Sequence, residues 1–131
     1  MTEDNIRHLP RIGIGEAMRL YGMTARAIRF YEEKGLIEAR RDRMNCRFYD
    51  GAARRRLSWI GPLRAAGLSL ADILAVLEAE EENGRGRECA IGKLQNRRQA
   101  VQTELAKVDL ALTRLDEAPH AGVQLRNGSL R

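Results

Sequence analysis

The segment "TARAIRFYEEKGLIEARRDRMNCRFYD", residues 24–50, starts as a short helix and continues into a loop that is rich in arginine. Thr24 is a suitable N-cap for the helix, and Gly35 is a suitable residue to end it. After a polar tip at about residues 42–45, where Asn45 can adopt a positive φ, apolar and charged residues alternate. The pattern predicts a helix followed by a small, basic β-hairpin.

Another short helix is predicted before this segment, in "IGIGEAMRLYG" at residues 12–22. One face of it carries the apolar side chains Ile14, Ala17, Met18 and Tyr21. Gly22 ends the helix, and about three residues join it to the next one, as in a helix-turn-helix. A basic hairpin directly after a helix-turn-helix is a winged arrangement, which favours a binding surface over a solvated loop.

The positive charge of the chain is concentrated in its first half. Residues 1–70 contain 14 Lys and Arg against 8 Asp and Glu, a net of +6, whereas residues 71–131 contain 9 against 10, a net of −1. The whole chain carries a net charge of +5 and has a pI of about 9.8, which makes nucleic acid the first partner to consider. Hydrophobic residues make up 44% and aromatic residues 5%, which suits a mainly α fold of packed aliphatic helices.

The cysteines and the lack of long apolar segments indicate where in the cell the protein is expected. Cys46 and Cys89 lie 43 positions apart, without the spacing of a structural zinc site. No N-terminal apolar run resembles a signal peptide, and no segment approaches the roughly 18 apolar residues of a membrane span. A reduced, cytoplasmic protein that does not enter a membrane is expected.

Two more helices are predicted within residues 52–84, with a break at Gly67. Their buried faces are expected to consist of Leu57, Ile60 and Leu63 in the first helix, and of Leu70, Ile73, Leu74 and Leu77 in the second. Pro62 lies inside the pattern of the first helix, where it removes a backbone donor. That helix is therefore expected to be kinked or to begin later than its pattern suggests.

The last predicted element is a long helix over residues 88–117, whose apolar residues recur at spacings of three and four. This heptad seam, interrupted by Arg98, consists of Ile91, Leu94, Val101, Leu105, Val108, Leu112 and Leu115. A helix with so narrow an apolar stripe is not stable alone in water. Because the chain has no second long heptad helix, a homodimeric coiled coil is favoured over an intramolecular hairpin. Residues 118–131 have no periodicity and are interpreted as a mobile tail.

Three motifs follow one another along the chain: RFYE at residues 29–32, RFY at 47–49 and GLSL at 67–70. Together with the first helix and the single long helix, they resemble the MerR family of bacterial transcription regulators. The resemblance covers residues 11–80 closely, as a winged helix-turn-helix DNA-binding domain. It covers residues 88–117 by pattern only, as a dimerisation helix.

The resemblance implies a transcription regulator that binds double-stranded promoter DNA as a homodimer. Two recognition helices would occupy successive major grooves, and the wings would contact the flanking backbone. The protein would bend and untwist the DNA, so that RNA polymerase can engage promoter elements that are otherwise too far apart. RNA polymerase is thus an indirect partner, and no cofactor follows from the sequence.

Each residue assigned to DNA also has a physical reason. Thr24 would cap the recognition helix and direct its amides at a phosphate, and Arg26 would contact a base edge, because arginine pairs bidentately with guanine. Contacts to phosphate are expected from Arg29, Tyr31, Arg40, Arg43 and Arg47. Tyr49 would either pack under the wing or donate to a phosphate, and Phe30 is expected in the core. One further phosphate contact is expected among Arg54, Arg55 and Arg56.

Cys89, at the start of the long helix, is the candidate sensor residue. Its position resembles that of the first metal ligand in some metal-binding members, and a helix N-terminus favours the thiolate. His120 or solvent would then have to complete a site. The sequence favours the alternative, a small apolar residue at the start of the dimer helix, so that no metal site is predicted. Cys46 is expected to pack within the wing.

Two other functional classes fit the sequence less well than a regulator does. A small architectural DNA-binding protein of the excisionase type has a similar winged motif without an effector. The long heptad helix disfavours it, since such proteins end soon after the wing. An enzyme is disfavoured because no nucleophile–base pair, phosphate loop or carboxylate dyad stands out.

Overall fold

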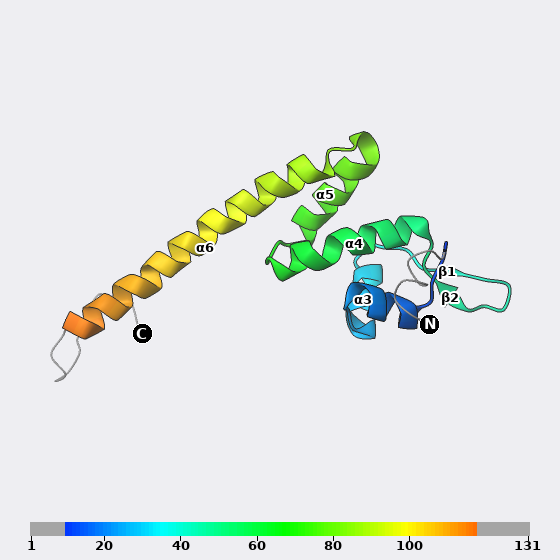
Figure 1. Ribbon diagram of the computed structural model, residues 1–131, viewed down its shortest axis with the longest axis horizontal. Coiled ribbons are helices and arrows are strands. Elements are labelled where there is room, and N and C mark those ends of the chain that lie inside the picture. The colour runs from blue at the N-terminus through cyan, green and yellow to red at the C-terminus, as the bar shows by residue number, and fades with distance from the viewer. Residues whose placement is uncertain (1–9, 118–131) are drawn as a thin grey trace. The chain divides into compact units, whose positions relative to one another are not determined.

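The fold is mainly α-helical, with a two-stranded hairpin between α3 and α4 (Figure 1). The computed structural model describes residues 10–117. Its elements are α2 (Ile14–Tyr21), α3 (Ala25–Glu33), β1 (Arg40–Arg41), β2 (Arg47–Phe48), α4 (Gly51–Ala65), α5 (Leu70–Asn83) and α6 (Gly86–Glu117). The chain divides into two compact units, one ending at Leu94 and the other beginning at Gln95 within α6.

The turn between α2 and α3 is formed by the residues that the sequence indicated. Gly22 ends α2 with a φ of +64°, a left-handed conformation that glycine adopts without strain. The hydroxyl of Thr24 accepts a hydrogen bond from the N–H of Ala27 at 3.1 Å and so caps α3. The predicted helix-turn-helix is confirmed.

The hairpin after α3 is a wing of two short antiparallel strands. Its register places Arg40 opposite Phe48 and Arg41 opposite Arg47. At the tip, Asn45 has a φ of +62°, as the sequence predicted. The basic hairpin is therefore confirmed.

Ile12 pairs with the end of the wing rather than belonging to a helix. Its N–H donates to the carbonyl of Tyr49 at 3.0 Å, and the N–H of Tyr49 donates back to the carbonyl of Ile12 at 2.7 Å. This bridge holds the chain extended, so that α2 begins at Ile14 and not at residue 12. The start of the first unit is thereby attached to the wing.

The core of the first unit draws side chains from the wing and from α3, α4 and α5. The largest fully buried ones are Tyr49, Ile28, Leu36, Leu57, Ile60, Ile73, Leu77 and Val76. Gly67, with a φ of +89°, breaks the chain between α4 and α5, and the hydroxyl of Ser69 caps α5 by accepting the N–H of Asp72 at 3.1 Å. The predicted buried face of α4 is confirmed, whereas Leu70 and Leu74 of α5 are only half-buried.

α4 continues through Pro62 from Gly51 to Ala65. The expected later start of this helix is wrong, because the Asp50 carboxylate accepts the N–H of Ala53 at 3.0 Å and fixes the N-terminus well before the proline. Pro62 lies in the last turn and is exposed, so that its missing N–H costs one hydrogen bond near the helix end.

α5 turns sharply into α6 at residues 84–86. Gly84 has a φ of +71°, and the N–H of Gly86 donates to Oε1 of Glu80 at 3.1 Å. A Cβ at position 86 would lie 2.7 Å from the Cβ of Glu80 and 3.2 Å from the ring of Trp59. This close approach requires glycine at the start of α6.

We expect Gly86→Ala to lower the free energy of unfolding by about 1–3 kcal/mol, because the added methyl group must displace packed atoms. Gly92→Ala is the matched control, since a Cβ at this other glycine of α6 meets nothing within 4 Å. The control change should raise the free energy of unfolding by roughly 0.5–1 kcal/mol, because alanine is the better helix former. Urea unfolding measures both, and equal values for the two variants would contradict the tight corner.

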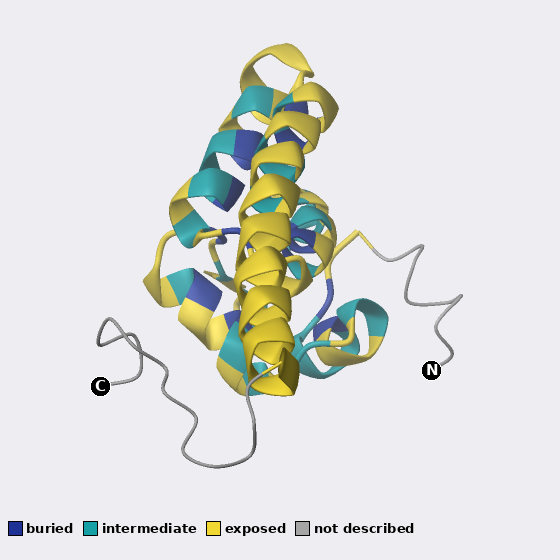
Figure 2. Ribbon diagram, turned by 90° about the vertical axis from the view of Figure 1, so that its left-hand side faces the viewer, coloured by how far each residue is buried: buried dark blue, intermediate teal, exposed yellow. Residues whose placement is uncertain are grey.

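The unit that begins at Gln95 consists, in its described residues, of the remainder of α6. Every residue from 98 to 117 is exposed (Figure 2). The heptad residues in this range are between 41% and 60% exposed: Val101, Leu105, Val108, Leu112 and Leu115. Ile91 is also exposed, whereas Leu94 is half-buried against the core of the first unit. Leu94 is thus already partly covered within the chain.

Two expectations lie outside the described residues: the tail at residues 118–131 and the possible contribution of His120. Within residues 10–117, no helix combines the length and the apolar composition needed to cross a membrane.

Candidate nucleic-acid interface

One face of α3 is basic and exposed while the opposite face is buried. Arg26 and Arg29 are exposed, whereas Ile28 is 0% and Tyr31 7% exposed. The helical repeat explains this, because residues three apart share a face. The first turn of α3 contains no acidic side chain, so the positive end of the helix dipole is not offset there. This end of α3 is suited to an anion.

Two aromatic residues of α3 occupy positions opposite to those expected. Phe30 is 36% exposed and Tyr31 is buried, so both the core assignment of Phe30 and the exposure of Tyr31 are wrong. Tyr31 follows Ile28 by three residues and therefore points toward the core. The phosphate contact assigned to Tyr31 stays a prediction. The two rings meet edge to face, with centroids 5.8 Å apart.

The tip of the wing is ordered by the carboxylate of Asp42. Its Oδ1 accepts hydrogen bonds from the N–H groups of Met44 and Cys46, both at 2.9 Å. The guanidinium of Arg41 donates to a backbone carbonyl of the same turn at 2.9 Å. Arg43 is exposed on this turn. The tip thus presents a cation on a backbone that is held in one conformation.

The base of the wing holds two arginines beside carboxylates. Nε of Arg40 lies 2.9 Å from Oδ2 of Asp50, and Nε of Arg47 lies 3.7 Å from Oε1 of Glu32. The N–H of Ala53, and then Arg40, lower the pKa of Asp50, which keeps this carboxylate ionised. The side chain of Arg40 remains 61% exposed, so its guanidinium is still accessible from solvent.

The hydroxyl of Tyr49 is buried and bound to α3. Tyr49 is 0% exposed, and its hydroxyl donates to Oε2 of Glu32 at 2.9 Å. Of the two roles expected for Tyr49, packing under the wing is confirmed. Donation to a phosphate is wrong, because Glu32 already takes the proton and the side chain does not reach the surface. The contact instead attaches the wing to α3.

Burial, followed by the hydrogen bond to Glu32, raises the pKa of Tyr49 to about 12 from an ordinary 10.0. The folded protein therefore keeps a proton that the unfolded chain releases, and this stabilisation is complete below about pH 10 and lost as the pH rises toward about 12. Tyr49→Phe should remove this part of the pH dependence. Urea unfolding between about pH 9 and about pH 11.5 tests it, since the other tyrosines contribute equally to both proteins. If the free energy of unfolding declined with pH by the same amount in the wild type and in Tyr49→Phe, Tyr49 would not titrate in this way.

Arg56 joins α4 to α5 and to the segment before the wing. Its Nε and Nη2 donate to the two carboxylate oxygens of Glu81 at 2.7 and 2.6 Å, and its Nη1 donates to the carbonyl of Leu36 at 2.9 Å. The hydrogen bond between the two side chains raises the pKa of Arg56 and lowers that of Glu81. Arg56 is therefore not simply solvated, because two of its donor groups bind Glu81 of α5 and the third binds the segment before the wing.

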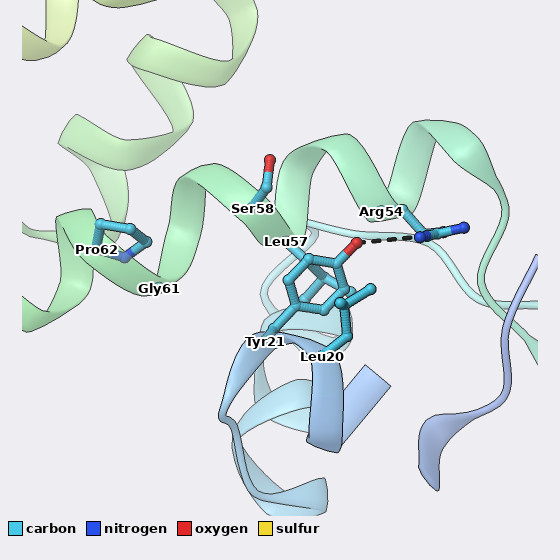
Figure 3. Close-up of a pocket in the computed structure, with 7 residues that line it drawn as sticks. All are labelled: Leu20, Tyr21, Arg54, Leu57, Ser58, Gly61 and Pro62. Carbon is cyan, nitrogen blue, oxygen red and sulfur yellow. Dashed lines mark hydrogen bonds between the residues drawn. The ribbon is translucent and has the colours of Figure 1, made fainter. Parts of the chain in front are cut away.

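Arg54 lies beside a hollow between α2 and α4 (Figure 3). The hollow has a volume of about 480 Å³ and is lined by Leu20, Tyr21, Arg54, Leu57, Ser58, Gly61 and Pro62. Nε of Arg54 donates to the hydroxyl of Tyr21 at 3.4 Å, so this arginine helps to hold α2 on α4. Arg55 is exposed, and the single phosphate contact predicted among Arg54, Arg55 and Arg56 stays a prediction.

The two cysteines differ in exposure. Cys89 is the fourth residue of α6 and is half-buried against the core of the first unit, as expected for a small apolar residue. Cys46 is exposed, so its expected packing role is wrong. Among residues 10–117, no three His, Cys, Asp or Glu side chains gather as a metal site. The sensor role of Cys89 stays a prediction.

A family model described as MerR HTH family regulatory protein matches residues 12–80, a range that contains α2, α3, the wing and α4 and ends within α5. The chain belongs to the MerR family. The match covers the helix-turn-helix, the wing and the helix pair that supports them. All residues assigned here to DNA lie within it.

Relatives within and beyond this range agree with the MerR assignment. The chain is 31% identical over 134 residues to the HTH-type transcriptional regulator GlnR of Bacillus anthracis, covering 99% of this chain and 96% of that protein. It is 42% identical over 66 residues to the HTH-type transcriptional activator SoxR homolog of Chromobacterium violaceum, covering 50% of this chain but only 45% of that protein. The crystal structure of HiNmlR, a MerR family regulator lacking the sensor domain and bound to promoter DNA, shares the fold with a TM-score of 0.55 at 24% identity, over 81% of each chain.

Membership of the MerR family makes this chain a DNA-binding transcription regulator and not an enzyme. The sequence motifs were sufficient for that conclusion. They did not reveal the exposed Phe30 or the roles of Arg56 and Tyr49 in positioning the wing, although the spacing of Phe30 from Ile28 contained the signal for its exposure.

Proposed function

We propose that this MerR-family protein binds promoter DNA as a homodimer and distorts it to control the access of RNA polymerase. The proposal rests on the exposed arginines of α3 and the wing, together with the exposed heptad seam that α6 carries. The HiNmlR structure, which has the same fold on promoter DNA, supports the choice of partner. The protein would act in the cytoplasm, where the promoter is accessible.

In the proposed complex, α3 enters the major groove by its N-terminal end. The amides that Thr24 leaves open at this end face a phosphate, because the positive end of the helix dipole attracts an anion. Arg26, in the first turn, reads a guanine through two parallel hydrogen bonds. Arg29, on the same exposed face, binds the backbone.

The wing contacts the backbone beside the groove. Arg43 is exposed at the ordered tip, and Arg40 and Arg47 lie at the base with part of each side chain accessible. Contacts of this kind supply affinity that depends on salt and carry no sequence information. Behind these arginines, Tyr49 holds the wing to α3, and Arg56 holds the segment before the wing to α5.

The dimer would form through α6. α6 is 32 residues long, and its apolar stripe is exposed in the part that belongs to the second unit. A helix with such a stripe requires a partner in water. The seam of three-and-four spacing fits a second copy of the same helix. The alternative, an architectural DNA-binding protein without an effector, has no use for such a seam, and the long helix therefore favours the dimeric regulator.

The salt dependence of DNA binding tests the proposal. Removing one phosphate contact from each protomer by Arg43→Ala should reduce the slope of log K against log salt by roughly two for a dimer, and should weaken cognate and scrambled duplexes equally. Arg87→Ala, which removes an exposed arginine from the start of α6, is the matched control and should leave the slope unchanged. Equal slopes for the wild type and Arg43→Ala would mean that the wing tip does not contact DNA.

A further inference from the structure

Phe30 is an exposed aromatic residue on the arginine-bearing face of α3, and none of the assigned contacts uses it. It follows Arg26 by four residues and Arg29 by one, so that the helical repeat sets its side chain beside that of Arg26. Phe30 is 36% exposed, whereas Ile28 on the opposite face is fully buried. A phosphate cannot bury an apolar ring on this face, whereas an apolar group on the edge of a base can.

The ring of Phe30 is held in position although it is exposed. Tyr31 contacts it edge to face, with a centroid distance of 5.8 Å and an interplanar angle of 62°. The ammonium group of Lys34 lies 5.5 Å from the centroid of the ring, within the range of a cation–π contact. A side chain ordered before binding loses little conformational entropy when it binds. Lys34 also adds positive charge over the ring.

We propose that Phe30 contacts the 5-methyl group of a thymine in the major groove, beside the base that Arg26 reads. The methyl group is the apolar group that thymine displays on its major-groove edge, and phenylalanine is one of the side chains that contact it. The inference rests on the proposed function and deepens it. α3 then selects one base by the hydrogen bonds of Arg26 and a neighbouring one by the apolar contact of Phe30.

The experiment uses the duplex that the full-length wild type selects from a random pool, with each thymine replaced in turn by deoxyuridine. This replacement removes only the methyl group. The wild type should lose about four-fold in affinity at one thymine of each half-site, the effect expected when one methyl group is no longer buried. Phe30→Ala should bind the thymine and uracil duplexes equally, and Phe30→Leu should keep part of the difference.

Met18→Ala is the matched control, because Met18 has the same 36% exposure but lies on α2. It should discriminate between the duplexes as the wild type does. A wild type that binds its selected duplex without distinguishing any uracil from thymine would overturn this inference and leave the proposed function intact. If Phe30→Ala still distinguished thymine from uracil as the wild type does, the inference would likewise be overturned and the proposed function left intact. Failure of the wild type to select any duplex would overturn the proposed function together with the inference.

Discussion

Replacing Leu105 with aspartate is expected to convert the protein into monomers that no longer hold operator DNA. Leu105 lies in the middle of the heptad seam and is 56% exposed in the single chain. In the proposed dimer, the change would place a carboxylate from each copy in an apolar contact without a partner. Two such groups, at about 2 kcal/mol each, would weaken dimerisation by roughly a thousand-fold.

Leu110→Asp is the control for Leu105→Asp. Leu110 is 52% exposed on the same helix, but it does not belong to the three-and-four spacing of the seam. Its replacement should leave the dimer intact. Sedimentation velocity of the two variants distinguishes the cases. A dimer that survives Leu105→Asp, or one that both changes disrupt equally, would show that the seam has been assigned to the wrong face.

Arg26→Ala is expected to reduce the preference for the operator over scrambled DNA by roughly 1–3 kcal/mol, the contribution of one bidentate contact to a base. Arg26 is exposed in the first turn of α3, where the end of a recognition helix meets base edges. The affinity for scrambled DNA should change much less. Titrations on both duplexes at one salt concentration measure the effect.

Arg43→Ala is the comparison for Arg26→Ala, because Arg43 is assigned to a phosphate and Arg26 to a base. It is expected to lower the affinity for both duplexes by the same factor, because a phosphate contact does not depend on sequence. Equal losses of specificity in Arg26→Ala and Arg43→Ala would remove the distinction between the helix and the wing. In that case α3 would not be the element that reads the sequence.

Local features of the fold followed from the sequence because neighbouring residues determine them. Gly22 and Thr24 set the turn between α2 and α3 through a left-handed φ and a capping hydroxyl, and Asn45 set the tip of the wing. The exposure of Phe30 and the burial of Tyr31 could also have been predicted from the sequence. Ile28 marks the core face of α3, and the helical repeat then points Tyr31 inward and Phe30 outward.

Contacts between distant segments were not available from the sequence. The hydroxyl of Tyr49 finds Glu32, and Arg56 finds Glu81, only after the wing, α3, α4 and α5 have packed. An arginine in a run of three has no local feature that separates a structural role from a solvated one. In the fold, Arg56 becomes the residue that fixes the segment before the wing through the carbonyl of Leu36.

The heptad residues on α6 were predicted to form a dimer seam, and this assignment stays a prediction. Val101, Leu105 and Val108 are exposed along one helix. Their periodicity is a property of the sequence, whereas their partner is a property of the assembly. The proposed dimer is therefore argued from the cost of leaving such a stripe in water.

Hydroxyl-radical footprinting of the wild type on the promoter upstream of its own gene tests the central claim most directly. A dimer with two recognition helices should protect two regions on one face of the DNA, centred about 10 base pairs or a whole multiple of that apart. The centre of the protected pair should lie in the spacer between the promoter elements, where bending and untwisting would act on RNA polymerase. One unpaired region of protection, or a pair that lies away from the spacer, would contradict the proposed dimer and its mechanism.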